Sequence, residues 1–328
     1  MFKNFFFDKS IPYIITIFIC ATIFSFLVGS GLYGYGVDFN GGYSKGFEWN
    51  RVNATGFDYW GYKIATLKFF EYPVGVYITT FILTLSSGFL IKEFLKLKKI
   101  FSLSFFIVIL TICVHTWPII MSTSNAMRQG LTMSFFFLSL VCTLNKRYYW
   151  MALFSTLSLV MHKSGPFFFS LILISNAVPK IFEYFQFKQK LLINFLLGLL
   201  MFLFTLFVLK FLILPTDMEP TRIIKNDFRL PFLIIAVVYI MLSFVFKSFN
   251  ENSLFLSLYY FSFISPAILF CGLNWQYERL GMMMLIPYLM SYGIMLRKNF
   301  YKIYLVFMYL ALLFLTIITD MYSYGLKH

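Results

Sequence analysis

Long apolar runs separated by short polar turns occupy most of the chain, and their lengths predict helices that cross a membrane. A membrane-spanning helix needs about 20 apolar residues, because the hydrocarbon core of a bilayer is about 30 Å thick. Eleven runs match this pattern, at residues 11–30, 73–91, 100–120, 127–145, 148–163, 165–181, 191–213, 230–247, 253–272, 280–296 and 303–320. We therefore expect an all-α, polytopic integral membrane protein whose single domain covers residues 1–328.

One boundary in this pattern decides the topology of everything that follows it. Ser164-Gly165-Pro166 interrupts a long apolar run, and glycine and proline there predict two helices instead of one. If the run were a single helix, every later segment would change sides. The first run, Ile11 to Ser30, is too long for the core of a signal peptide and is expected to stay in the protein.

The polar turns between the runs predict the orientation. Turns rich in lysine and arginine favour the cytoplasmic side. Three such turns are Lys96-Leu97-Lys98-Lys99, Asn145-Lys146-Arg147 and Arg297-Lys298. They place the amino terminus in the cytoplasm and, with eleven spans, the carboxyl terminus outside. The two longest polar segments, residues 31–72 and 214–229, are then outer loops.

The arginines depart from the distribution of the lysines. Thirteen of the twenty lysines fall on the predicted cytoplasmic side, whereas five of the seven arginines fall outside: Arg51, Arg128, Arg222, Arg229 and Arg279. Because basic residues resist translocation, arginine outside needs a separate reason. The guanidinium is planar, permanently charged and suited to phosphate oxygens, which predicts a phosphate-bearing ligand at the outer face.

Composition narrows the class of protein further. The chain is 60% hydrophobic and 12% charged, with a mean hydropathy of +0.80, which leaves no room for a sizeable soluble domain. The net charge of +14 lies mostly on the predicted cytoplasmic side, so it indicates contact with membrane lipids and not with nucleic acid. Four cysteines without paired spacing and three histidines predict no metal site. The sequence contains no nucleotide-binding motif and no nucleophile motif, so we expect no cofactor.

Arg128 and His162 are the first candidates for chemistry. The helix from Gln129 to Lys146 would be about 24 Å long, shorter than the bilayer core, so Arg128 should lie slightly below the outer surface. His162 follows Tyr148 after about 14 residues and should reach a similar depth. Ionisable groups at membrane depth are rare and often functional. The alternative is a snorkelling arginine and an interfacial histidine.

A second candidate region is the predicted outer turn Trp275-Gln276-Tyr277-Glu278-Arg279. Arg279 begins an apolar run, and Glu278 is a carboxylate that could take part in catalysis. The alternative is that the two form a surface ion pair worth under about 1 kcal/mol. In the first outer loop, Asp38, Tyr43 and Asp58 could bind a sugar, because carboxylates bond to hydroxyls and an aromatic ring packs on the face of a sugar. Aromatic belts at membrane interfaces have a similar composition. The stretch from Asp58 to Phe70 is expected to form an amphipathic helix at the interface.

Two motifs in these regions carry a family resemblance. Asn125-Ala126-Met127-Arg128-Gln129-Gly130-Leu131, followed by Met161-His162-Lys163-Ser164, resembles the EpsG family of Wzy-like polysaccharide polymerases. Asp38 and Tyr43 match its outer segment after the first span, and Arg279 matches a late arginine. Asp58-Tyr59-Trp60-Gly61-Tyr62 matches a third element only loosely, because it lacks the proline.

The resemblance implies polymerisation of oligosaccharide repeat units carried on undecaprenyl diphosphate, at the outer face of the bacterial cytoplasmic (inner) membrane. The product would be O-antigen, capsule or exopolysaccharide, and a repeat-unit flippase and a chain-length regulator would be partners. The expected diphosphate-binding residues are Arg128, Arg279, Arg222 and Arg229. His162 is the first candidate for the general base, with Glu278 and Asp38 in reserve. The expected glycan contacts are Asn125, Gln129, Tyr43, Asp58, Trp275 and Tyr277.

Three other functions remain open at this point. A flippase for the same lipid needs a polar route through the bilayer, but the span centres carry almost no acids or bases, which favours an enzyme at one face. A membrane acyltransferase would carry an early histidine and arginine pair, which Ile11 to Ser30 lacks. An O-antigen ligase-like transferase shares the donor and the face, so only the family resemblance separates it from a polymerase.

Overall fold

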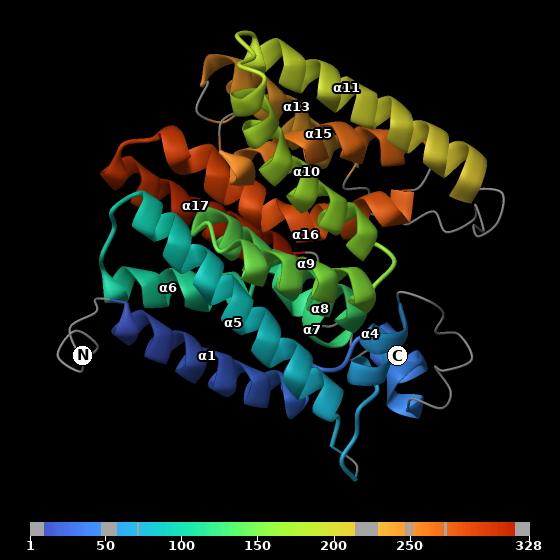
Figure 1. The fold of residues 1–328 in the computed structure, drawn as a ribbon. Helices are drawn as coiled ribbons and strands as arrows, with labels where there is room; N and C mark the ends of the chain where they lie inside the picture. Colours follow the sequence, from blue (N-terminus) through green and yellow to red (C-terminus); the bar gives the residue numbers. More distant parts are fainter. Residues whose placement is uncertain are drawn as a thin grey trace. The chain divides into compact units, whose positions relative to one another are not determined.

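The computed structural model describes residues 10–46, 58–70, 72–213, 229–246, 249, 252–271 and 274–318. Over these residues the protein is helical, and the only β pairing is an isolated bridge between Phe69 and Tyr72 (Figure 1). Each of the eleven predicted apolar runs coincides with a helix or a pair of helices. The predicted all-α class is therefore confirmed for the described part of the chain.

Seven of the described helices are long and apolar enough to cross a membrane, or eight if a bent pair counts as one span. The seven are α1 (Ile11–Gly29), α5 (Val74–Leu97), α8 (Met127–Leu144), α10 (Gly165–Tyr184), α11 (Lys190–Val208) with its π-helical extension η4 (Leu209–Ile213), α15 (Ser253–Phe270) and α17 (Lys298–Ile318). The bent pair is α6 (Leu103–Val114) and α7 (Trp117–Ser124). The remaining predicted runs form α9 (Tyr148–Met161), α13 (Arg229–Val245) and α16 (Asn274–Tyr292), with the short η5 (Gly293–Met295) after it.

The run at 100–120 is the one that departs most from a straight span. Its two helices, α6 and α7, meet at an angle of 58°. Pro118 lies in the first turn of α7. Its nitrogen cannot donate to the carbonyl of Val114, and its ring would clash with that carbonyl, so a continuous helix is disfavoured. The predicted break after α9 is confirmed, because His162 is extended and α10 begins at Gly165.

The chain forms two compact units, which are described separately here. The first unit contains residues 1–169 and 293–328. In it α5 packs between α1 and α8, and α8 pairs with α9. Three short helices join this unit in the first polar segment: α2 (Val37–Gly41), η2 (Tyr43–Lys45) and α4 (Tyr59–Ala65). In the second unit, residues 170–292, α15 packs against α11, α13 and α16.

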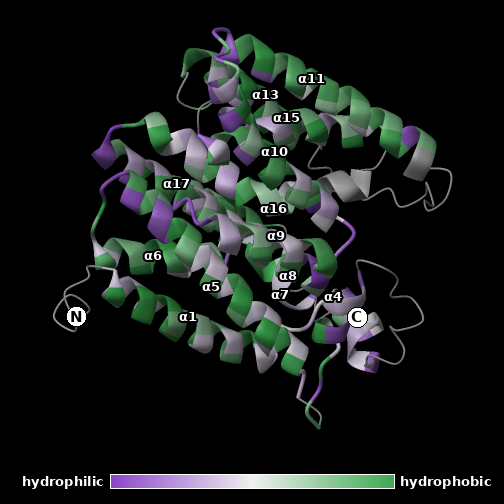
Figure 2. Cartoon of the chain, viewed as in Figure 1, coloured by the Kyte–Doolittle hydropathy of each residue, from purple (hydrophilic) through white to green (hydrophobic). Residues whose placement is uncertain are grey.

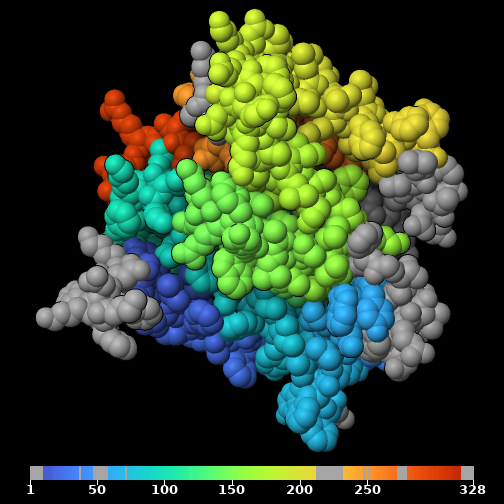
Figure 3. All heavy atoms as spheres, viewed as in Figure 1, coloured from blue at the N-terminus to red at the C-terminus, as the bar shows by residue number. Residues whose placement is uncertain are grey.

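The outer surface of α1 is apolar, as expected for a helix that contacts lipid. Figure 2 shows hydrophobic residues along most of α1, and Ile15, Ile19 and Phe26 are each more than half exposed. The bridged turn at Phe69 and Tyr72 projects from the first unit in light blue (Figure 3). Both rings are 66% exposed. Exposed apolar surface of this extent is typical of proteins that lie in a membrane.

The hairpin of α8 and α9 positions the candidate site. The two helices contain 18 and 14 residues, so they are only about 27 and 21 Å long, as the sequence predicts. They are antiparallel: Ser139 Oγ lies 2.6 Å from Ser155 Oγ, and Ser158 Oγ donates to the carbonyl of Thr132 at 3.2 Å. This register places the first turn of α8 beside the last turn of α9.

Candidate functional site

Arg128, in the first turn of α8, is held by three side chains from the first polar segment. Its Nη1 lies 3.1 Å from Asp58 Oδ2, and its Nε donates to Tyr43 Oη at 3.1 Å. Its guanidinium carbon lies 3.8 Å from the centre of the Tyr62 ring, a cation–π contact. We call Arg128, Tyr43, Asp58 and Tyr62 the Arg128 cluster. The sequence-predicted candidates Arg128, Tyr43 and Asp58 thus lie in direct contact.

Asp58 connects this cluster to the end of α9. Its side chain is 4% exposed, and Oδ1 accepts from the backbone N–H of Lys163 at 2.9 Å while Oδ2 pairs with Arg128. A buried carboxylate is costly unless it is paired and hydrogen-bonded, and both oxygens of Asp58 are. The short helix α4, which begins directly after Asp58, is therefore fixed against both members of the α8–α9 hairpin.

Gly61 permits this close packing. A Cβ at Gly61 would overlap with the carbonyl oxygen of Met161 and would lie 3.2 Å from Arg128 Cγ. The glycine therefore lies between the last residue of α9 and the Arg128 side chain. Any larger residue would push α4 away from the hairpin.

His162 lies immediately after α9 and is only 5% exposed. Its Nδ1 accepts from the backbone N–H of Ser164 at 3.2 Å and lies 2.9 Å from Ser164 Oγ. Because an N–H can only donate, this arrangement favours the neutral tautomer with its proton on Nε2. The ring can then donate from Nε2, whereas the lone pair of Nδ1 is already used.

A hydrogen bond joins Asn125 and Asp38. Asn125, at the end of α7, accepts the backbone N–H of Asp38 at its Oδ1, at 2.9 Å. Gly36 packs so closely on Asn125 that a Cβ there would overlap with it. Asn125 therefore positions the start of α2, and the Asp38 carboxylate is left exposed. Gln129, next to Arg128, is 4% exposed, and neither of its amide atoms has a hydrogen-bond partner among the described residues.

Tyr43 is the member of the cluster whose ionisation is most affected. Burial raises the pKa of its phenol, and the nearby Arg128 guanidinium lowers that pKa in part. The hydroxyl is therefore neutral at physiological pH, and its oxygen can accept the hydrogen bond from Arg128.

The remaining predicted site residues belong to residues 170–292, the second unit. Arg279 lies on α16 in the second unit and is half-buried. The side chains of Arg229, Trp275, Tyr277 and Glu278 lie outside the description, although their backbones belong to α13 and α16. Arg222, like Arg51, lies outside the described residues.

Three residues that the sequence analysis did not select belong to the site. Tyr62 follows Asp58 by four positions, so a helical face shared with Asp58 was a signal that could have identified it. Lys163 anchors Asp58 through its backbone N–H. Lys63, on α4, lies 5.1 Å from the ring of the half-exposed Trp60. These lysines add positive charge beside a cluster in which Asp58 already balances Arg128.

Comparison of the chain with protein-family models, with curated proteins and with solved structures found no match. The function is therefore inferred from the residues and the geometry of the site.

Proposed function

We propose that this protein is a membrane glycosyltransferase that polymerises oligosaccharide repeat units linked to undecaprenyl diphosphate. The reaction would take place at the outer face of the bacterial cytoplasmic membrane. The observation that carries the proposal is the Arg128 cluster, because a guanidinium oriented by Asp58, Tyr43 and Tyr62 is fixed before substrate arrives. Preorganised charge of this kind stabilises a leaving diphosphate without reorganisation during the reaction.

Arg128 keeps one donor nitrogen for a phosphate oxygen. Nη1 and Nε are engaged by Asp58 and Tyr43, and no described residue accepts from Nη2. Because Asp58 balances the charge of Arg128, a diphosphate needs further cations. Lys63 and Lys163 lie on the segments that hold the cluster and add positive charge there. For Arg279, Arg229 and Arg222 the same role stays a prediction from the sequence.

For His162 we propose a donor role in place of the general base that the sequence analysis put first. Ser164 N–H occupies Nδ1, so the ring carries its proton on Nε2, and a donor of this kind suits a phosphate or sugar oxygen. Of the acids described at this end of the first unit, Asp58 is committed to Arg128 and Lys163, whereas the Asp38 carboxylate is exposed. Asp38 is therefore the proposed base, with Glu278 as its alternative.

The proposed step transfers a glycan in one displacement. The acceptor hydroxyl oxygen bonds to the anomeric carbon of the donor sugar, and its proton passes to the Asp38 carboxylate. The bond between that carbon and the diphosphate oxygen breaks, and the lipid diphosphate leaves with the electron pair. Arg128 and His162 donate hydrogen bonds to the departing oxygens, and the exposed Trp60 offers an aromatic face to a sugar.

A ladder assay with purified protein in detergent tests this function. The substrate is the undecaprenyl-diphosphate-linked repeat unit, and the product is resolved by length on a gel. A polymerase extends it by whole repeats, a ligase-like enzyme transfers it once, and a flippase leaves it unchanged, since micelles have no sides. Arg128→Lys keeps the charge but loses the planar fork, and we expect about a tenfold to hundredfold loss of rate.

A histidine pair supplies the matched control. His115, directly after α6, is hydrogen-bonded to Tyr33 Oη at 2.9 Å and to the carbonyl of Thr111 at 2.7 Å, and neither partner belongs to the Arg128 cluster. His162→Gln should shorten the ladder, whereas His115→Gln should leave it unchanged at equal protein level. Normal ladders from both Arg128→Lys and His162→Gln would refute the proposed site.

A further inference from the structure

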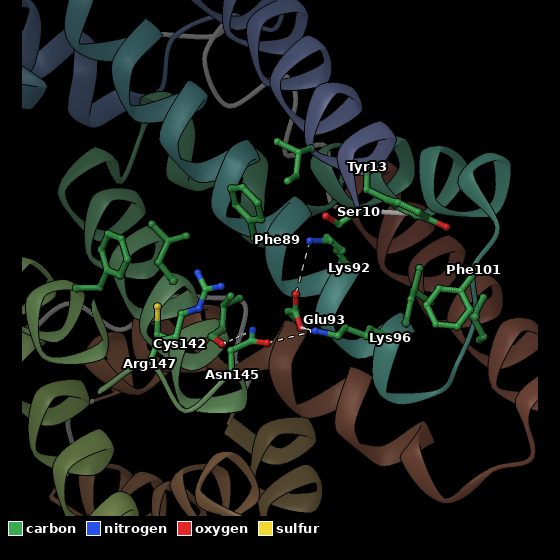
Figure 4. A pocket seen from close by; sticks show the side chains of 16 residues that line it. Ser10, Tyr13, Phe89, Lys92, Glu93, Lys96, Phe101, Cys142, Asn145 and Arg147 are labelled. Carbon is green, nitrogen blue, oxygen red and sulfur yellow. Dashed lines mark hydrogen bonds and ion pairs between the residues drawn. The ribbon is translucent and has the colours of Figure 1, made fainter. Parts of the chain in front are cut away.

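The first unit contains a cavity that the proposed reaction does not use. Its volume is about 600 Å³, and it is bounded by residues of α1, α5, α8 and the start of α9 (Figure 4). Lys92, Glu93 and Lys96 line it from α5, and Asn145 and Arg147 line it from the turn between α8 and α9. We call this space the Glu93 cavity.

The Glu93 cavity and the Arg128 cluster lie at opposite ends of the same helices. On α8, Cys142 lines the cavity and Arg128 lies in the first turn, 14 residues earlier and therefore about 21 Å away. The turn that supplies Arg147 is one of the basic turns that predict the cytoplasmic side. A ligand of the cavity is thus distinct from the substrate of the outer site.

The cavity is basic, and part of that charge is held in place. Glu93 is 7% exposed, with Lys92 Nζ at 3.8 Å and Lys96 Nζ at 3.4 Å. Lys96 also donates to Asn145 Oδ1 at 3.3 Å. Figure 4 shows both lysines reaching toward Glu93 and Arg147 on the other side of the space. No described carboxylate pairs with Arg147, so three cations against one carboxylate leave two positive charges.

The other walls are apolar. Ile14 of α1, Phe89 of α5 and Phe154 of α9 line the same space as the charged groups. A site with cations at one end and hydrocarbon walls beside them matches an amphiphile that carries a phosphate. Basic pockets between transmembrane helices on the cytoplasmic side are typical sites for anionic lipid head groups.

We propose that the Glu93 cavity binds an anionic phospholipid. Its phosphate would contact Arg147, Lys92 and Lys96, and an acyl chain would lie along the apolar walls. Free phosphate shares the head-group chemistry, but it would fill little of a cavity of about 600 Å³ and would leave the apolar walls in contact with water. A lipid is therefore the ligand that matches both the cations and the apolar walls of the cavity.

Native mass spectrometry measures this binding. The full-length protein is mixed in detergent with increasing concentrations of phosphatidylglycerol and then released from the micelles. Phosphatidylcholine supplies the neutral lipid arm, and inorganic phosphate is added as a competitor. Arg147→Gln should weaken the binding of phosphatidylglycerol by about fivefold. The double variant with Lys92→Gln added should weaken it by about another fivefold. The matched control is Lys146→Gln, which removes the same charge from the adjacent exposed position that does not line the cavity.

Glu93→Gln should strengthen lipid binding, and a loss of folding could not cause such an increase. Removal of the carboxylate releases Lys92 and Lys96 for the phosphate, so phosphatidylglycerol should bind several-fold more tightly. The proposal is overturned if Arg147→Gln and Lys146→Gln bind the lipid equally. Equal retention of phosphatidylcholine, or displacement of the lipid by millimolar inorganic phosphate, would also overturn it. None of these outcomes depends on glycan polymerisation.

Discussion

The two ionic clusters of the first unit lie near opposite ends of α8 but are built differently. The Arg128–Asp58 pair has side chains that are 17% and 4% exposed, and Tyr43 and Tyr62 complete the contacts of its cation. At the other end, the side chain of Glu93 is 9% exposed, whereas those of its partners Lys92 and Lys96 are 17% and 58% exposed, beside an open cavity. One cluster surrounds its arginine with side chains, whereas the other leaves Lys96 exposed and both lysines at the wall of a cavity.

This difference separates a fixed ion pair from an adaptable one. Arginine offers a rigid planar fork that several partners can hold at once, while lysine is a point charge on a flexible stem. The Arg128 cluster therefore suits a function that needs one geometry. The Glu93 cavity suits a ligand whose position varies, such as a lipid head group. Four substitutions test whether the energetics follow this contrast.

The largest effect is expected for Asp58→Asn. The amide still accepts the Lys163 N–H but leaves the mostly buried Arg128 without its counter-charge. Breaking a buried pair by removal of one partner costs about 3–5 kcal/mol. The free energy of unfolding in mixed detergent micelles measures this loss. A change below about 1 kcal/mol would mean that Arg128 is hydrated and that the cluster is not enclosed.

Gly61→Ala should give the next largest loss of stability, and it tests the packing of α4 without a change of charge. The added methyl group would meet the backbone oxygen of Met161, which cannot move without displacing the end of α9. Overpacking of this kind costs about 1–3 kcal/mol. Unfolding in mixed micelles measures the loss, with Gly41→Ala as control, since a Cβ at Gly41 meets no atom within 4 Å. Equal stability of the two variants would contradict the close contact.

Part of this site could be predicted from the sequence, and the limits have physical reasons. Arg128 and His162 were predictable because helix length fixes depth, so two short neighbouring runs had to end near the same level. Asp58 and Tyr43 were selected for their chemistry alone. Their contact with Arg128 depends on how the first polar segment folds back on the helices, and no periodicity in that segment encodes it. Pro118 divides the run at 100–120, which apolar length alone predicted as one span.

The Glu93 cavity shows a different limit. The basic turns identified a side of the membrane, but a cavity forms where side chains from α1, α5, α8 and α9 fail to fill the space between helix ends. Such a packing defect depends on the angles and the register of four helices. Sequence reasoning treated Lys92, Lys96 and Arg147 as a topological signal only.

Tyr43→Phe should have a smaller effect that depends on pH. Loss of the hydrogen bond to Arg128 costs about 1 kcal/mol near neutral pH. Because burial raises the pKa of Tyr43 in the folded protein, the unfolded chain ionises first as the pH passes about 10. The wild type therefore loses stability above that pH, and Tyr43→Phe lacks this loss. Unfolding measured at pH 8 and at pH 11 should show the difference between the two proteins narrowing. A difference that widens would contradict the burial of the phenol.

The smallest effect on stability is expected for Glu93→Gln, which is the counterpart of Asp58→Asn at the other end of α5 and α8. Both substitutions exchange a mostly buried carboxylate for its amide, so the side-chain volume hardly changes. Here the released cations reach water through the cavity, and exposed ion pairs contribute about 0–1 kcal/mol. The same unfolding measurement should therefore give a loss several times smaller than that of Asp58→Asn. Similar losses at the two ends would mean that the cavity does not hydrate Lys92 and Lys96, and the distinction between a fixed and an adaptable cluster would be lost. A small loss together with tighter binding of phosphatidylglycerol would instead assign the Glu93 charge to control of lipid affinity and the Asp58 charge to the fold itself.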